Sequence, residues 1–231
     1  MGYALSRTEN MKEAEATMLK ALALPLYSAN PERYFRDYAY AAAVFYSNPD
    51  YHGEVINWCV EAIHQAQLSD NTSGKQWVTA MLGAIYKKDG DLNRALALLL
   101  QSEEEAKARK DDLAVLNSLN SLVDLFLYWN IPEYADLYAT KAVKQETDMR
   151  IKNPMVSGQT YINKGRALHQ LGKMDSILFY TDQAKMICRS LPYNSGMVDV
   201  NLLEGIYMTE KGGDSLEPGI QQLQNVIREG T

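Results

Sequence analysis

The chain has 231 residues, of which 46% are hydrophobic, and a formal net charge of −6 at pH 7. This composition is typical of a globular protein with enough apolar residues for one or two cores. Basic residues are scattered rather than clustered, which argues against nucleic-acid binding through this segment, and no run reaches the roughly 18 apolar residues of a membrane span.

Apolar residues recur with a period of about 3.6 residues between short polar breaks, and the chain lacks the sustained period-two alternation of strands. The pattern predicts an all-α chain whose helices are separated by segments rich in Pro, Gly, Asn and Asp. In chain order the predicted breaks are 24–32, 47–50, 68–75, 87–91, 108–112, 130–132, 151–154, 170–173, 191–196 and 211–218. Tight and looser breaks are expected to alternate, so that the helices come in antiparallel pairs.

An internal repeat underlies these pairs. The segments that superpose without gaps are 41–62, 81–102, 121–142 and 163–184. Each has a small residue early, an aromatic residue or Leu three positions later, a turn, and a small residue that closes the second helix. The closing residues are Ala62, Ser102, Ala142 and Ala184, which gives a period of 40 to 42 residues. With a partial first copy and a looser last one, the predicted repeats are 1–30, 31–70, 71–110, 111–150, 151–192 and 193–231.

Packing explains the residue types at these positions. Two antiparallel helices approach closely only where small side chains lie at their crossing, with large side chains on either side. Gly83 and Gly165 occupy the predicted crossing in two of the first helices. The repeated glycine, aromatic and alanine positions are therefore assigned to the core rather than to function.

The best-preserved copy, LGAIYKKDGDLNRALALLLQS at 82–102, carries a Leu-Gly pair, a Tyr, a Gly-Asp turn, an Ala and a closing small residue. This pattern resembles the tetratricopeptide repeat. The segment that begins at Tyr161, YINKGRALHQLGK, is similar, and the resemblance covers almost the whole chain. It implies a single right-handed α-solenoid of stacked helix pairs over 1–231. The closing Pro of the family is absent, and the period exceeds the usual 34 residues or so. Repeats with such a long period are similar to those of bacterial regulators and adaptor scaffolds.

Residues that could support catalysis are not grouped. The three histidines, His52, His64 and His169, lack metal-ligand spacing, and no CxxC motif occurs. We therefore expect no enzymatic activity from this chain alone, and neither a metal nor a cofactor. The acidic run Glu103 to Glu105 is interpreted as a solvated helix face, with Glu103 paired to Lys107 one turn later.

The resemblance implies a concave wall formed by the first helices, where the side chains opposite the packing stripe would line a peptide-binding groove. Amide side chains match the donor and acceptor of a peptide group, and Arg can hold a carboxylate through two hydrogen bonds. The predicted groove residues are Lys87, Asn117, Asn120, Asp124, Tyr128, Gln159, Asn163, Arg166, His169 and Asn201. A plain solvated helix surface is the alternative interpretation.

Taken together, the sequence predicts a protein- or peptide-binding domain that serves as the sensory or scaffolding part of a larger signalling or transcription regulator. The alternatives are a regulatory segment of a multidomain enzyme, and a self-associating scaffold without a groove ligand.

The first copy begins inside a helix, and the last helix carries an apolar face of Ile220, Leu223, Val226 and Ile227. We therefore expect a piece of a longer protein, or a homodimer formed through the terminal helices. Neither nucleic acid nor membrane is expected as a partner of this segment. The cytoplasm is preferred slightly as its compartment, and the periplasm is the alternative if the segment belongs to a membrane-anchored regulator.

Overall fold

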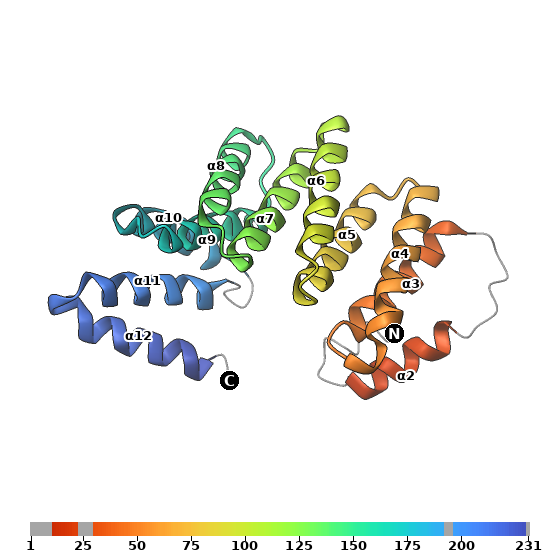
Figure 1. Ribbon diagram of the computed structural model, residues 1–231, viewed down its shortest axis with the longest axis horizontal. Helices are drawn as coiled ribbons and strands as arrows, with labels where there is room; N and C mark the ends of the chain where they lie inside the picture. Colours follow the sequence, from red (N-terminus) through yellow and green to blue (C-terminus); the bar gives the residue numbers. More distant parts are fainter. Residues whose placement is uncertain (1–10, 23–29, 192–195, 230–231) are drawn as a thin grey trace. The chain divides into compact units, whose positions relative to one another are not determined.

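The computed structural model describes residues 11–22, 30–191 and 196–229, and over these ranges the backbone forms eleven α-helices and no strand (Figure 1). The helices are α2 (Met11–Leu22), α3 (Pro31–Phe45), α4 (His52–Leu68), α5 (Thr72–Lys88), α6 (Leu92–Ala108), α7 (Asp112–Tyr128), α8 (Pro132–Asp148), α9 (Pro154–Gln170), α10 (Met174–Cys188), α11 (Met197–Lys211) and α12 (Leu216–Glu229). Single 3-10 turns lie at Pro49–Tyr51 and Gly213–Ser215. The predicted all-α class is confirmed. The start of the predicted first copy, residues 1–10, lies outside the described residues.

Local signals in the sequence set where the helices begin. The side chains of Asn71, Asp111 and Asn153 each accept a hydrogen bond from a backbone N–H in the first turn of the helix that follows. Such caps satisfy donors that have no partner within the helix. Pro132 and Pro154 stand at the start of α8 and α9, where the missing N–H of proline costs nothing.

The turns between helices differ from the expected alternation of tight and loose breaks. Three residues connect helices both within and between several of the pairs, for example 89–91 before α6, 109–111 before α7 and 129–131 before α8. The second helices are as long as the first, 17 residues in both α7 and α8, and this length accounts for the long period. A residue with positive φ reverses the chain in each of several turns, at Asp70, Gly90, Lys110, Asn130 and Gly172.

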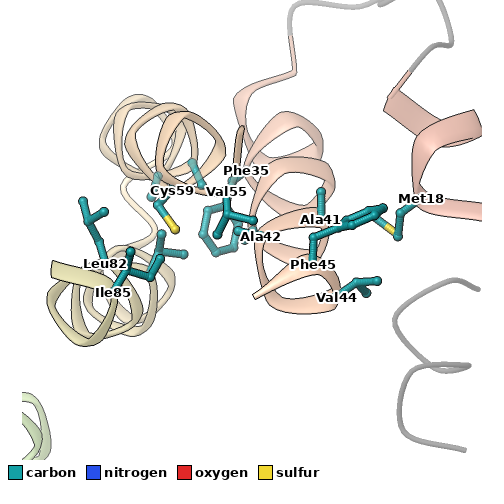
Figure 2. Packing of buried hydrophobic residues seen from close by; sticks show 14 of the residues in the cluster. Met18, Phe35, Ala41, Ala42, Val44, Phe45, Val55, Cys59, Leu82 and Ile85 are labelled. Carbon is teal, nitrogen blue, oxygen red and sulfur yellow. The ribbon is translucent and has the colours of Figure 1, made fainter. Parts of the chain in front are cut away.

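The chain divides into two compact units, Met1–Ser102 and Glu103–Thr231. In the first unit, α3 packs against α4 through Phe35, Ala42 and Val55, and Met18 of α2 reaches the other side of α3 (Figure 2). Small side chains permit this close packing, since Ala39, Ala41 and Ala42 are fully buried. Leu82 and Ile85 of α5 close the same core.

In the second unit α9 is the central element, because it packs against α7, α8, α10 and α11. Close approach again depends on small residues. A β-carbon on Gly165 would lie 3.0 Å from the Leu203 side chain of α11, and one on Gly205 would lie 2.8 Å from Leu223 of α12. The organisation of the chain as one solenoid domain over 1–231 stays a prediction.

Two expectations need revision. The pairing of Glu103 with Lys107 is present, with 2.5 Å between Oε1 and Nζ, but the Glu103 side chain is only 7% exposed, so its position is not part of a solvated face. On α12, Leu223 packs on Gly205, whereas Ile227 is 66% exposed. The apolar surface of the last helix is therefore partly covered by α11.

Candidate functional site

Helix α7 is buried on every side except one. Its buried side chains run from Ala114 to Leu127. The residues left at the surface recur every three or four positions, at Asn117, Ser121, Asp124 and Tyr128, so they form one stripe along the helix. Tyr128 is the most exposed member of this stripe, at 56%.

Helix α9 continues this surface. Gln159 is exposed and Arg166 is half-buried, and the two lie seven residues apart on one side of the helix. The Arg166 Nη1 atom lies 3.7 Å from the Asp124 Oδ1 atom of α7. One turn later, Gln170 Nε2 donates a hydrogen bond of 3.2 Å to the backbone carbonyl of Leu127. We call the surface formed by Asn117, Ser121, Asp124, Tyr128, Gln159 and Arg166 the α7–α9 face.

Asn120 and Asn163 lie beneath this surface rather than on it, at 7% and 2% exposure. The amide of Asn163 donates to the backbone carbonyl of Asn120 over 3.3 Å, and that of Asn120 donates to the Thr160 hydroxyl over 2.9 Å. Gln159 in turn donates to Asn163 Oδ1 over 2.9 Å. The structure differs here from the sequence-based expectation, because both asparagines join α7 to α9 instead of facing solvent.

The remaining predicted residues are His169, Asn201 and Lys87, and the contacts of the first two are with other helices. His169 turns toward α11, where its Nε2 lies 3.1 Å from Glu210 Oε1. The backbone carbonyl of Asn201 on α11 accepts a hydrogen bond from Gln222 of α12, which places residue 201 beside α12. Lys87 lies in the last turn of α5, in the first compact unit.

The Arg166–Asp124 pair is partly exposed to solvent. Both side chains are about two-fifths exposed, at 41% and 42%. An ion pair in such a position gains little from its mutual attraction because water screens the charges. The planar guanidinium carries five N–H donors, so a carboxylate of a partner molecule can compete for it.

Buried polar contacts hold α9 in place below this surface. Lys164 bonds Asp136 Oδ1 and the Thr140 hydroxyl of α8, at 2.5 and 2.8 Å, and it is only 7% exposed. The Tyr161 hydroxyl donates to Glu146 Oε2 over 2.8 Å. Burial and this hydrogen bond raise the pKa of Tyr161 to about 12. These contacts fix the face of α9 that meets α8, and thereby the face that carries Arg166.

Sequence reasoning missed two kinds of residue. Ser121 belongs to the α7 stripe, and Gln170 joins α9 to the end of α7. The spacing of four from Asn117 and from Arg166 would have found them. No spacing in the sequence shows that Asn120 and Asn163 are buried, since a polar residue on a first helix is consistent with burial as well as with exposure.

Within the ranges that the structure describes, no helix is long and apolar enough to cross a membrane. Over the same ranges, no three His, Cys, Asp or Glu side chains gather closely enough to hold a metal ion. Both cysteines, Cys59 and Cys188, are buried free thiols, and burial raises the pKa of each, that of Cys59 to about 12.

No protein-family model matches the chain, and no curated protein sequence matches it. Solved structures with similar folds include the following two. The apo form of RapI matches with a TM-score of 0.76 at 12% identity, over 99% of this chain and 80% of RapI. BtubC (BKLC) from P. vanneervenii matches with a TM-score of 0.64 at 17% identity, over 79% of this chain and 75% of BtubC. Together with the successive packing of the helices, these likenesses establish a helical-repeat solenoid fold.

Proposed function

We propose that this chain is a protein- or peptide-binding domain and that the α7–α9 face is its binding surface. The observation that carries the proposal is the contrast along α7, where from Ala114 onward only the stripe from Asn117 to Tyr128 is left at the surface. A stripe that combines amide, carboxylate, hydroxyl and aromatic groups suits recognition of a polypeptide. The tetratricopeptide-like period supports the same class of function, as the sensory or scaffolding part of a larger regulator.

The chemistry of the face favours an extended peptide with a carboxylate. Asn117 and Gln159 can donate and accept at once, as a peptide group requires. Arg166 can hold a side-chain or C-terminal carboxylate through two hydrogen bonds, and the exposed ring of Tyr128 offers an apolar contact. Because a flexible peptide loses conformational freedom on binding, we expect an affinity of roughly micromolar Kd.

The supporting contacts make this surface rigid. Asn163 donates a hydrogen bond to the backbone carbonyl of Asn120, and Gln170 donates one to that of Leu127. These bonds join α7 and α9 at two positions along the helices. A surface held in one arrangement spends less binding free energy on its own ordering. Of the alternatives, self-association is favoured by exposed apolar side chains elsewhere in the second unit, such as Phe179 at 61% exposure.

The experiment is a selection of random displayed peptides against the native protein, followed by titration of a selected synthetic peptide by fluorescence anisotropy. Arg166→Ala and Tyr128→Ala should each weaken binding by roughly tenfold, the loss of one well-placed contact. Arg94→Ala, an exposed residue of α6, is the matched control and should bind as the wild type does. If the selection yields no binder, or if the α7–α9 variants bind as well as the control, the proposal is wrong.

A further inference from the structure

The α7–α9 face contains one cation and one anion, Arg166 and Asp124, and the structure pairs them with each other. The other Asp and Lys side chains of these two helices contact α8 instead. Asp112, at the start of α7, accepts a hydrogen bond of 3.1 Å from Gln145 of α8, and Lys164 of α9 bonds α8 from a buried position. The attraction of this face for a ligand carboxylate therefore comes from Arg166.

A second carboxylate lies near the same part of α9. The Nε2 atom of His169, three residues after Arg166, lies 3.1 Å from Glu210 Oε1 of α11. Because residues three apart are neighbours on a helix surface, Glu210 adds negative charge near Arg166 rather than a second attraction for an anion. A ligand carboxylate that reaches Arg166 thus meets one cation with carboxylates on both neighbouring helices, Asp124 on α7 and Glu210 on α11.

The contact between Arg166 and Asp124 is close enough for attraction but too long for a hydrogen bond. The Nη1 and Oδ1 atoms are 3.7 Å apart, whereas N–H···O hydrogen bonds span about 2.7–3.2 Å between the heavy atoms. The carboxylate of a ligand can instead hold a guanidinium through two short hydrogen bonds. A ligand therefore gains more from Arg166 than Asp124 does, and it can displace Asp124 from its partner.

This displacement has a cost that depends on the charge of the ligand. The ligand carboxylate and Asp124 approach the same guanidinium, so the two negative charges come close to each other. In water, two like charges about 4 Å apart repel by an amount equal to about a fivefold change in affinity. Each further acidic group beside the first adds to this repulsion, whereas a neutral group does not.

We infer that Asp124 determines the specificity of the α7–α9 face: it competes with the ligand for Arg166 and thereby selects peptides with a single, isolated carboxylate over peptides with clustered acidic residues. The inference rests on the proposed function, because it concerns the same surface and the same class of ligand. Asp124 weakens the binding of every ligand that carries a carboxylate, and it weakens the binding of an acidic cluster most.

Fluorescence anisotropy at low salt, where screening is weakest, tests the inference. The probe is a labelled peptide, selected on the native protein from a displayed library and amidated at its C-terminus, that contains one Asp or Glu. A second form of the probe carries the corresponding Asn or Gln, and a third form has an extra Asp next to the acidic residue.

Asp124→Asn should bind the acidic probe about fivefold more tightly than the wild type does, and the amide form with unchanged affinity. The extra Asp should weaken binding about fivefold for the wild type and less than about twofold for Asp124→Asn. In a chain that also carries Arg166→Ala, Asp124→Asn should gain less than about twofold, because the contested cation is absent. Asp112→Asn, the same substitution on the side of α7 that contacts α8, is the matched control and should leave the Kd unchanged. Circular dichroism confirms that each variant is folded.

If Arg166→Ala binds the probe as well as the wild type does, the proposed function and this inference both fail. If Arg166→Ala weakens binding but Asp124→Asn leaves it unchanged or weakens it, the proposed function stands and only the inference is overturned. An equal gain from Asp112→Asn, or an undiminished gain beside Arg166→Ala, also overturns it, because overall charge rather than competition for Arg166 would then explain the effect. Selected peptides that all lack acidic residues, or that all carry acidic clusters, contradict it as well.

Discussion

Asn163 on α9 donates a side-chain hydrogen bond to the backbone carbonyl of Asn120 on α7, 3.3 Å away, and both residues are almost completely buried. This contact joins the two helices that carry the candidate binding surface. Two residues that the sequence assigns to ligand contact thus support that surface from below. The consequence is that substitutions there should act on stability as well as on binding.

Replacing Asn163 with Ala should lower the free energy of unfolding by about 1–3 kcal/mol, because Gln159 loses its acceptor and the carbonyl of Asn120 loses a donor in a buried site. Urea unfolding followed by circular dichroism measures the change. The exposed neighbour gives the control: Gln159→Ala should cost less than about 0.5 kcal/mol. Equal stability of the two variants would contradict the inference that Asn163 stabilises the contact between α7 and α9.

The buried ion pair between Lys164 and Asp136 should be the most sensitive polar contact of the second unit. Lys164→Met removes the cation that faces a carboxylate only 20% exposed. We expect a loss of about 3 kcal/mol, the lower end for a broken buried pair, since Lys173 still lies 3.5 Å from Asp136. Lys144→Met breaks an exposed pair on the same helix as Asp136 and should cost under about 0.5 kcal/mol. Both are measured by urea unfolding at a protein concentration where the chain is monomeric.

Two glycines should respond to alanine in opposite directions. A β-carbon on Gly205 would lie 2.8 and 2.9 Å from two side-chain atoms of Leu223, so Gly205→Ala requires Leu223 or α12 to shift and should destabilise by about 1–2 kcal/mol despite the better helix propensity of alanine. Gly53, at the start of α4, has nothing within 4 Å of such a β-carbon. Gly53→Ala should stabilise by up to about 1 kcal/mol. Thermal unfolding midpoints distinguish the two, and a rise in both would show that α11 and α12 are not closely packed.

Alkaline pH should weaken the native state through Tyr161. Burial, followed by its hydrogen bond to Glu146, raises the pKa of this tyrosine from the ordinary 10.0 to about 12. The folded chain thus holds the proton more tightly than the unfolded chain, so its stabilising effect is complete below pH 10 and is lost as the pH rises through about 12. Between pH 9 and 11 the unfolding free energy of Tyr161→Phe should therefore fall less steeply than that of the wild type. If the unfolding free energies of the two proteins fall in parallel with pH, Tyr161 is not the group responsible for the loss of stability.

The helices and the sites of their turns could be predicted because they depend on local features. The 3.6-residue period shows which residues lie inside, and Asn71, Asp111 and Asn153 mark helix starts in the sequence itself. The three-residue length of several turns could not be predicted, since Lys110 adopts a positive φ that its residue type does not favour.

The candidate site was predictable only in outline. The exposed stripe of α7 follows from periodicity, and Asn117, Asp124 and Tyr128 lie on it, whereas their part in binding stays a prediction. Burial of Asn120 depends instead on how closely α9 packs against α7. The apolar pattern of a single helix does not show how closely a neighbouring helix packs against it. Glu103 is a similar case, because a charged residue looks solvated in sequence although the Glu103 side chain is only 7% exposed, while its partner Lys107 stays 57% exposed.

The most direct test of the central claim is site-specific photo-crosslinking of a selected peptide, with benzoylphenylalanine in place of Tyr128 on the α7–α9 face or of Lys144 on α8. We expect the peptide to crosslink at position 128, and unlabelled peptide to suppress the product. Crosslinking at position 144 with none at 128 would contradict the claim that the α7–α9 face binds polypeptides.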